Sequence, residues 1–109
     1  MEPLHVLNVK RELVVIPRWY PCGKDFLIHR TVENHGWTIT HIRSHMAIIQ
    51  KILTRGKAFK LAAELALLTD KWHLIEDQKS MRRQLNYREQ GAVLDLALKV
   101  QLSRDWSFR

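Results

Sequence analysis

Residues 26–72 read FLIHRTVENHGWTITHIRSHMAIIQKILTRGKAFKLAAELALLTDKW, and two hydrophobic patterns meet within them at Thr54. Before Thr54, β-branched and aromatic residues form short runs separated by turn formers, which predicts strands over residues 26–32, 37–42 and 46–53. After Thr54, a hydroxyl residue suited to cap a helix, apolar residues recur at spacings of three and four, as on one buried helical face. They are Ala58, Leu61, Ala62, Leu65, Leu68 and Trp72.

Towards the N-terminus, residues 4–9 and 13–16 have strand composition. They are either two strands or one long strand bent at residues 10–12, and Pro17 ends the run because it lacks a backbone donor. Residues 18–25 contain a proline and a glycine and are expected to form a loop. Asn34 and Gly36 tolerate positive φ, which suits a hairpin turn between the next two strands.

Towards the C-terminus, we expect a break within residues 73–77 and helix over residues 78–102. Gly91 is either a weak point in that helix or a junction between two helices. The apolar residues from Val93 to Leu102 spread around the helix, so it is either sandwiched in the core or a subunit contact. The sequence thus predicts an α+β fold: an antiparallel meander of three to four strands over residues 4–53, then two or three helices over residues 55–103 packed on one face.

Composition indicates one small globular domain over residues 1–109, of which 46% are hydrophobic and 27% charged. The single cysteine excludes an internal disulfide framework, and no apolar run is long enough to span a bilayer. The N-terminus lacks the layout of a signal peptide, so we expect a cytoplasmic protein that does not bind membranes. Eighteen Lys and Arg against eleven Asp and Glu give a formal net charge of +7.

The positive charge is concentrated in two stretches without acidic residues, 34–63 and 78–88. Cations that lie together on a protein surface can contact successive phosphates, so we expect a non-enzymatic nucleic-acid-binding or regulatory protein that takes DNA or RNA. Lys79, Arg82, Arg83, Asn86 and Gln90 would share one face of a continuous helix, and Trp37 and Tyr87 could stack on unpaired bases. The predicted phosphate contacts are Arg43, Lys51, Arg55, Lys57, Lys60, Lys79, Arg82, Arg83 and Arg88.

Catalytic and metal sites find weaker support in the sequence. His41 and His45 are four residues apart, with His35 six residues before His41, but an HExxH zinc site needs this spacing on a helix and a glutamate where Ile42 stands. Cys22 and His29 could join these histidines in space, although a zinc site normally needs four well-placed ligands. Cys22 lies beside Lys24, which could lower the pKa of the thiol, but no base accompanies it in sequence. Ser44 lacks the glycines of a nucleophile elbow. We therefore expect no enzyme activity, cofactor or bound metal.

An alternative function is protein binding, as an adaptor or inhibitor for an acidic partner surface or as a homo-oligomer. Aromatic residues close to a chain end suggest packing against the protein itself or against a partner. Exposed apolar side chains on the last helix would serve the same purpose. The predicted interface consists of Leu94, Leu98, Leu102, Trp106 and Phe108.

Overall fold

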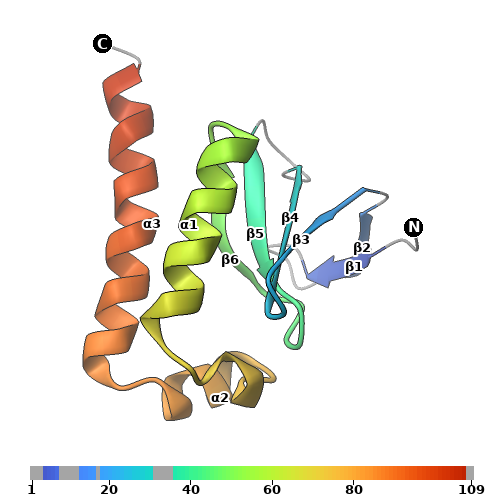
Figure 1. The fold of residues 1–109 in the computed structure, drawn as a ribbon, viewed down its shortest axis with the longest axis vertical. Helices are drawn as coiled ribbons and strands as arrows, with labels where there is room; N and C mark the ends of the chain where they lie inside the picture. The colour runs from blue at the N-terminus through green and yellow to red at the C-terminus, as the bar shows by residue number, and fades with distance from the viewer. Residues whose placement is uncertain (1–3, 8–12, 17, 31–35, 108–109) are drawn as a thin grey trace.

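The computed structural model describes residues 4–7, 13–16, 18–30 and 36–107, with side chains for residues 15–16, 18–30 and 36–100. A four-stranded antiparallel sheet, in the order β3-β4-β5-β6, forms the centre of the molecule (Figure 1). A separate antiparallel hairpin precedes it. The strands are β1 (Leu4–Leu7), β2 (Leu13–Ile16), β3 (Tyr20–Cys22), β4 (Phe26–Arg30), β5 (Trp37–His41) and β6 (Ala47–Ile52).

The helices follow the sheet in the chain and are α1 (Arg55–Leu68), the 3-10 turn η1 (Trp72–Leu74), α2 (Gln78–Gln84) and α3 (Tyr87–Ser107). Each α-helix begins at a side-chain cap. The Thr54 hydroxyl accepts a hydrogen bond from the Lys57 amide (3.1 Å), and Asp77 and Ser80 form a capping box at α2. The α+β class, with an antiparallel meander followed by helices packed against it, is confirmed.

The core lies between the sheet and α1. Antiparallel register places Phe26, Ile28 and Ile39 on one face of the sheet, where all three are fully buried. Ala58 and Ala62 of α1 are also buried in this core. Their small side chains let the helix approach the sheet closely. Alternation along the strands therefore directs half of each strand towards the helices.

The opposite face of the sheet is buried as well. Leu27, His29, Thr38 and Thr40 alternate with the core residues, and each is at most 3% exposed. Figure 1 shows the β1–β2 hairpin on the side of the sheet away from α1 and α3. The sequence did not predict that both faces of the central strands are buried.

Three sequence predictions are corrected in detail. The predicted loop over residues 18–25 contains β3, an edge strand bonded to β4 alone, where Pro21 is tolerated because an edge leaves one row of donors unused. The first two strands form their own hairpin instead of joining the meander. The helical region over residues 78–102 breaks at Leu85 and Asn86, not at Gly91, which lies inside α3. Asn86 and Glu89 cap the new helix with reciprocal hydrogen bonds of 2.8 and 3.0 Å.

Gly36 lies directly before β5, and its backbone conformation requires glycine. Its φ is +111°, and a Cβ atom there would lie 2.9 Å from the Ile52 carbonyl oxygen. We expect Gly36→Ala to lower the free energy of unfolding by about 1–3 kcal/mol, measured by urea denaturation. The matched control is Gly91→Ala in α3, where a Cβ would meet nothing within 4 Å. That change should stabilise the protein by about 0.5–1 kcal/mol, and a Gly36→Ala variant as stable as the parent would contradict the prediction.

Candidate functional site

The nine predicted phosphate contacts do not form one surface, because three of them are held elsewhere. Arg43, in the β5–β6 turn, donates to Glu76 at 2.8 Å. The guanidinium of Arg55 lies 5.2 Å from the ring centroid of Tyr20 in a cation–π contact. Lys51 lies at an irregularity in the β5–β6 ladder, with a φ of +61°.

Lys57 and Lys60 lie on α1, where they line a surface pocket together with Lys99 of α3. The remaining four predicted contacts gather around the junction of α2 and α3. We call this surface the α2–α3 corner and define it by Lys79, Arg82, Arg83, Tyr87 and Arg88. Its four cations are exposed, and none makes an ion pair within the part of the chain that the structure describes.

Spacing along α2 explains the first half of the corner. Lys79, Arg82 and Arg83 stand at positions i, i+3 and i+4, so they share one face of the helix, while Ser80 is buried on another. Tyr87 and Arg88 open α3 only three residues after α2 ends. Tyr87 is 92% exposed, so its ring is accessible for stacking.

Hydrogen bonds hold the two helices of the corner in a fixed relation. The side-chain amide of Gln90 donates from Nε2 to the backbone carbonyls of Leu85 (2.7 Å) and Arg82 (3.2 Å). Asn86 and Gln90 are therefore used to cap and join helices, which corrects the expectation that they would lie in the phosphate-binding face. Cations on such a fixed junction keep their spacing, which favours contact with successive phosphates.

Two carboxylates near the corner are engaged with the protein. Glu89 accepts from Lys71 at 2.9 Å, and hydrogen bonds from Thr69, the Asn86 amide and Lys71 lower the pKa of its carboxyl to about 2. Hydrogen bonds from Ser80 lower the pKa of Asp77, and the nearby charges of Arg83 and Lys79 lower it further. Asp77 remains ionised and offsets part of the positive charge on one side of the corner.

The corner and the lysines of α1 lie far apart. In Figure 1, α1 runs from its junction with β6 down towards α2, and α3 returns beside it in the opposite direction. Lys57 and Lys60 lie in the first half of α1, whereas α2 lies beyond its other end. Fourteen helical residues span about 21 Å, so the two groups of cations form separate surfaces.

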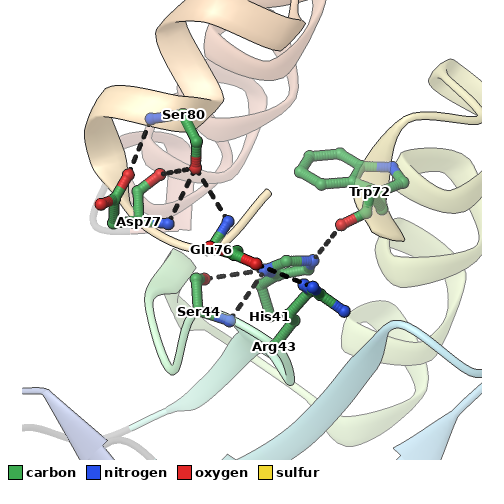
Figure 2. Close-up of polar contacts among 7 residues, drawn as sticks. All are labelled: His41, Arg43, Ser44, Trp72, Glu76, Asp77 and Ser80. Carbon is green, nitrogen blue, oxygen red and sulfur yellow. Dashed lines mark hydrogen bonds and ion pairs between the residues drawn. The ribbon is translucent and has the colours of Figure 1, made fainter. Parts of the chain in front are cut away.

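A polar cluster beneath the β5–β6 turn has the geometry of a serine–histidine pair (Figure 2). His41 Nδ1 accepts from the Ser44 hydroxyl at 2.7 Å, and His41 Nε2–H donates to the Trp72 carbonyl at 2.9 Å. A catalytic pair needs access to substrate, but His41 is fully buried and Ser44 is 7% exposed. The Ser44 hydroxyl also accepts from the Met46 amide at 3.2 Å, so the cluster fixes the turn against η1.

Two of the histidines considered as metal ligands, His29 and His41, use both ring nitrogens in hydrogen bonds. His29, on the other face of the sheet, donates from Nδ1 to the Arg30 carbonyl and accepts at Nε2 from the Thr40 hydroxyl (2.8 and 2.7 Å). No group of three or more His, Cys, Asp or Glu side chains among the described residues is arranged to hold a metal ion, and His35 lies outside those residues. Burial raises the pKa of the Cys22 thiol, contrary to the lowering considered from Lys24.

The predicted interface on the last helix is visible only in part. Leu94 is 63% exposed and Leu98 is 53% exposed, whereas Val93 and Leu96 are buried against the core. The helix therefore packs through one face instead of being sandwiched. The side chains of Leu102 and Trp106, and all of Phe108, lie outside the described residues.

No family model matches this chain, and no curated protein or solved structure is significantly similar to it. Over the described residues, no helix combines the length and the apolar character needed to cross a membrane.

Sequence reasoning missed two features that folding creates. Arg30 places its guanidinium 4.8 Å from the Trp37 ring centroid, and Tyr20 lies 6.1 Å from the same ring, so these side chains close the end of the sheet. Lys99 joins Lys57 and Lys60 although about forty residues separate them in sequence. The Arg30–Trp37 contact depends on the register of β4 and β5, in which the two residues are directly opposite. The approach of Lys99 to the lysines of α1 depends on packing between distant elements, which has no local sequence signal.

Proposed function

We propose that this protein binds single-stranded nucleic acid through the α2–α3 corner. The observation that supports this function is that two helices joined by hydrogen bonds carry four exposed cations and one exposed aromatic ring. Lysine and arginine side chains that neutralise phosphates release counterions, which supplies affinity without sequence specificity. Tyr87 adds a stacking surface for a base.

Stacking on Tyr87 favours a single strand over a duplex, because bases in a duplex already stack on one another. The cations lie on α2 and on the first turn of α3, two helices that run in different directions (Figure 1). A flexible strand can bend around such a junction and bring several phosphates to it. We therefore expect the same surface to accept DNA or RNA.

The test is fluorescence anisotropy of labelled single- and double-stranded DNA and RNA at about 50 and about 200 mM salt. The protein should bind single strands more tightly, with affinity that falls steeply as salt rises. The double variant Arg82→Ala/Arg83→Ala should reduce the slope of log affinity against log salt by about 1.4, since each phosphate contact to a single strand contributes about 0.7. Tyr87→Ala should weaken single-strand binding roughly 5- to 150-fold.

The matched control is Lys57→Ala/Lys60→Ala, which removes the same charge from the other end of α1. It should leave the salt slope nearly unchanged. Equal losses in the two double variants would mean that net charge, not the corner, governs binding. Absence of binding by the parent protein at low salt would overturn the proposed function.

Protein binding is the second candidate, favoured by the exposure of Leu94 and Leu98. The two leucines stand four residues apart on one side of α3, so they form a short apolar stripe on the longest helix. They are the residues to change first if no nucleic acid binds.

A further inference from the structure

A pocket of about 320 Å³ opens on the surface between α1, α3 and the end of β6. A volume in this range is typical of small-molecule sites, although it lies at their lower end. The β6 end contributes Ile52 and Leu53, and α3 contributes Lys99 and Val100. The side of α1 contributes Lys57, Lys60, Leu61 and Glu64, so four aliphatic side chains and four charged ones line the pocket.

The charged groups of this lining are unequal in sign. Three ammonium groups face one carboxylate, that of Glu64. Lys57 and Lys60 are three residues apart on one face of α1, and Lys99 approaches from a different helix. Within the described part of the chain, none of the three lysines makes an ion pair. An anion that reached all three would gain charge-assisted hydrogen bonds without displacing an internal partner.

The aliphatic part of the lining decides which anion fits. Ile52 is 1% exposed and forms an apolar floor, while Leu61 and Val100 are half-buried beside it. The lining contains no aromatic ring, hydroxyl or side-chain amide, so a nucleobase would find neither a stacking surface nor hydrogen-bond partners for its edge. An alkyl chain needs neither.

We propose that this pocket binds an amphiphilic carboxylate, with its alkyl chain on the aliphatic floor and its head group among Lys57, Lys60 and Lys99. Octanoate is a small ligand of this class, because it combines one negative charge with a short apolar chain. The site is independent of the α2–α3 corner, which lies beyond the other end of α1.

Isothermal titration of the full chain with sodium octanoate tests the proposal, with octanol and acetate as ligands that have only the chain or only the charge. We expect saturable binding of one octanoate, and binding of octanol and acetate at least about tenfold weaker. Lys60→Gln/Lys99→Gln should weaken octanoate binding by about tenfold or more, because two charged hydrogen-bond donors are lost. Lys79→Gln/Arg82→Gln, which removes equal charge from the α2–α3 corner, should leave it unchanged.

Several results would overturn the proposal. They are no saturable heat with millimolar octanoate, equal affinity for octanol, and equal weakening by the two double variants. Displacement of octanoate by a short single-stranded oligonucleotide would show instead that these lysines contact phosphates. All the substituted side chains are exposed, so we expect every variant to fold. Thermal unfolding of each variant checks this expectation. Failure of nucleic-acid binding at the corner would leave the octanoate result unaffected, so the two proposals fail separately.

Discussion

Replacing Trp72 with alanine is expected to lower the free energy of unfolding by about 3–5 kcal/mol, enough to unfold a large share of so small a domain. Trp72 is 1% exposed and meets Phe26 edge to face, with ring centroids 4.9 Å apart. Its indole N–H donates to the Leu65 carbonyl at 2.8 Å. The substitution therefore opens a cavity and also removes the donor to a buried carbonyl.

Urea denaturation followed by circular dichroism measures this loss, and two further variants make it interpretable. Trp72→Phe keeps most of the ring volume but lacks the N–H group, so it should lose less stability than Trp72→Ala. Tyr87→Ala removes an aromatic ring that is 92% exposed and should change stability by no more than about 0.5 kcal/mol. A Trp72→Ala variant as stable as Tyr87→Ala would contradict the buried position of the indole.

Acidification below about pH 6.5 is expected to destabilise the protein through His29 and His41. Burial lowers the pKa of both imidazoles, and their neutral forms already use both ring nitrogens in hydrogen bonds. In the unfolded chain each takes a proton near pH 6.5, whereas in the folded protein it stays neutral to lower pH. The unfolded state therefore binds more protons, and stability falls as the pH falls.

The slope approaches about 1.4 kcal/mol per pH unit for each imidazole until its folded pKa is reached. Above about pH 7.5 both states are neutral, and stability no longer depends on these two groups. Carboxylates titrate mainly below pH 5, so measurements between pH 5 and 7.5 isolate the histidines. Urea denaturation across this range should show stability rising with pH.

Substitution of single histidines shows which imidazoles cause the dependence of stability on pH. His41→Gln is expected to be less stable at every pH, because glutamine does not reproduce the packing of the ring, and its pH slope should be reduced by about half. Tyr87→Ala, which changes an exposed side chain and no imidazole, should keep the parent slope. An undiminished slope in both His41→Gln and His29→Gln would show that the buried imidazoles do not cause the acid sensitivity.

The accuracy of the sequence predictions follows the range of the interactions involved. Thr54 and the three-four spacing after it predicted α1, because a cap and a helical face are local properties. Asn86 and Glu89 form an equally local capping box, which the expectation of a continuous helix overlooked. β3 was missed because three residues around Pro21 gain strand structure only by pairing with β4.

In the candidate site too, features that depend on local sequence were predictable and features that depend on contacts between distant segments were not. Local sequence within residues 78–88 indicated the cations of the α2–α3 corner, since they lie on α2 and on the first turn of α3. The sequence did not show whether the two basic stretches lie on one surface, and in the structure α1 separates Lys57 and Lys60 from the α2–α3 corner along its length. The ion pair of Arg43 with Glu76 and the contact of Arg55 with Tyr20 depend on distant segments, so no local pattern indicated them.

The hydrogen bonds from His41 to the Trp72 carbonyl and from the Trp72 indole to the Leu65 carbonyl connect the sheet, η1 and α1 in one chain. Neither the strands nor the helices can open this connection without exposing polar groups that are otherwise satisfied. Unfolding should therefore be cooperative, with a single transition whichever probe is used. Amides of β5 and α1 should exchange with solvent only through global opening, so the sheet and the helices form one thermodynamic unit.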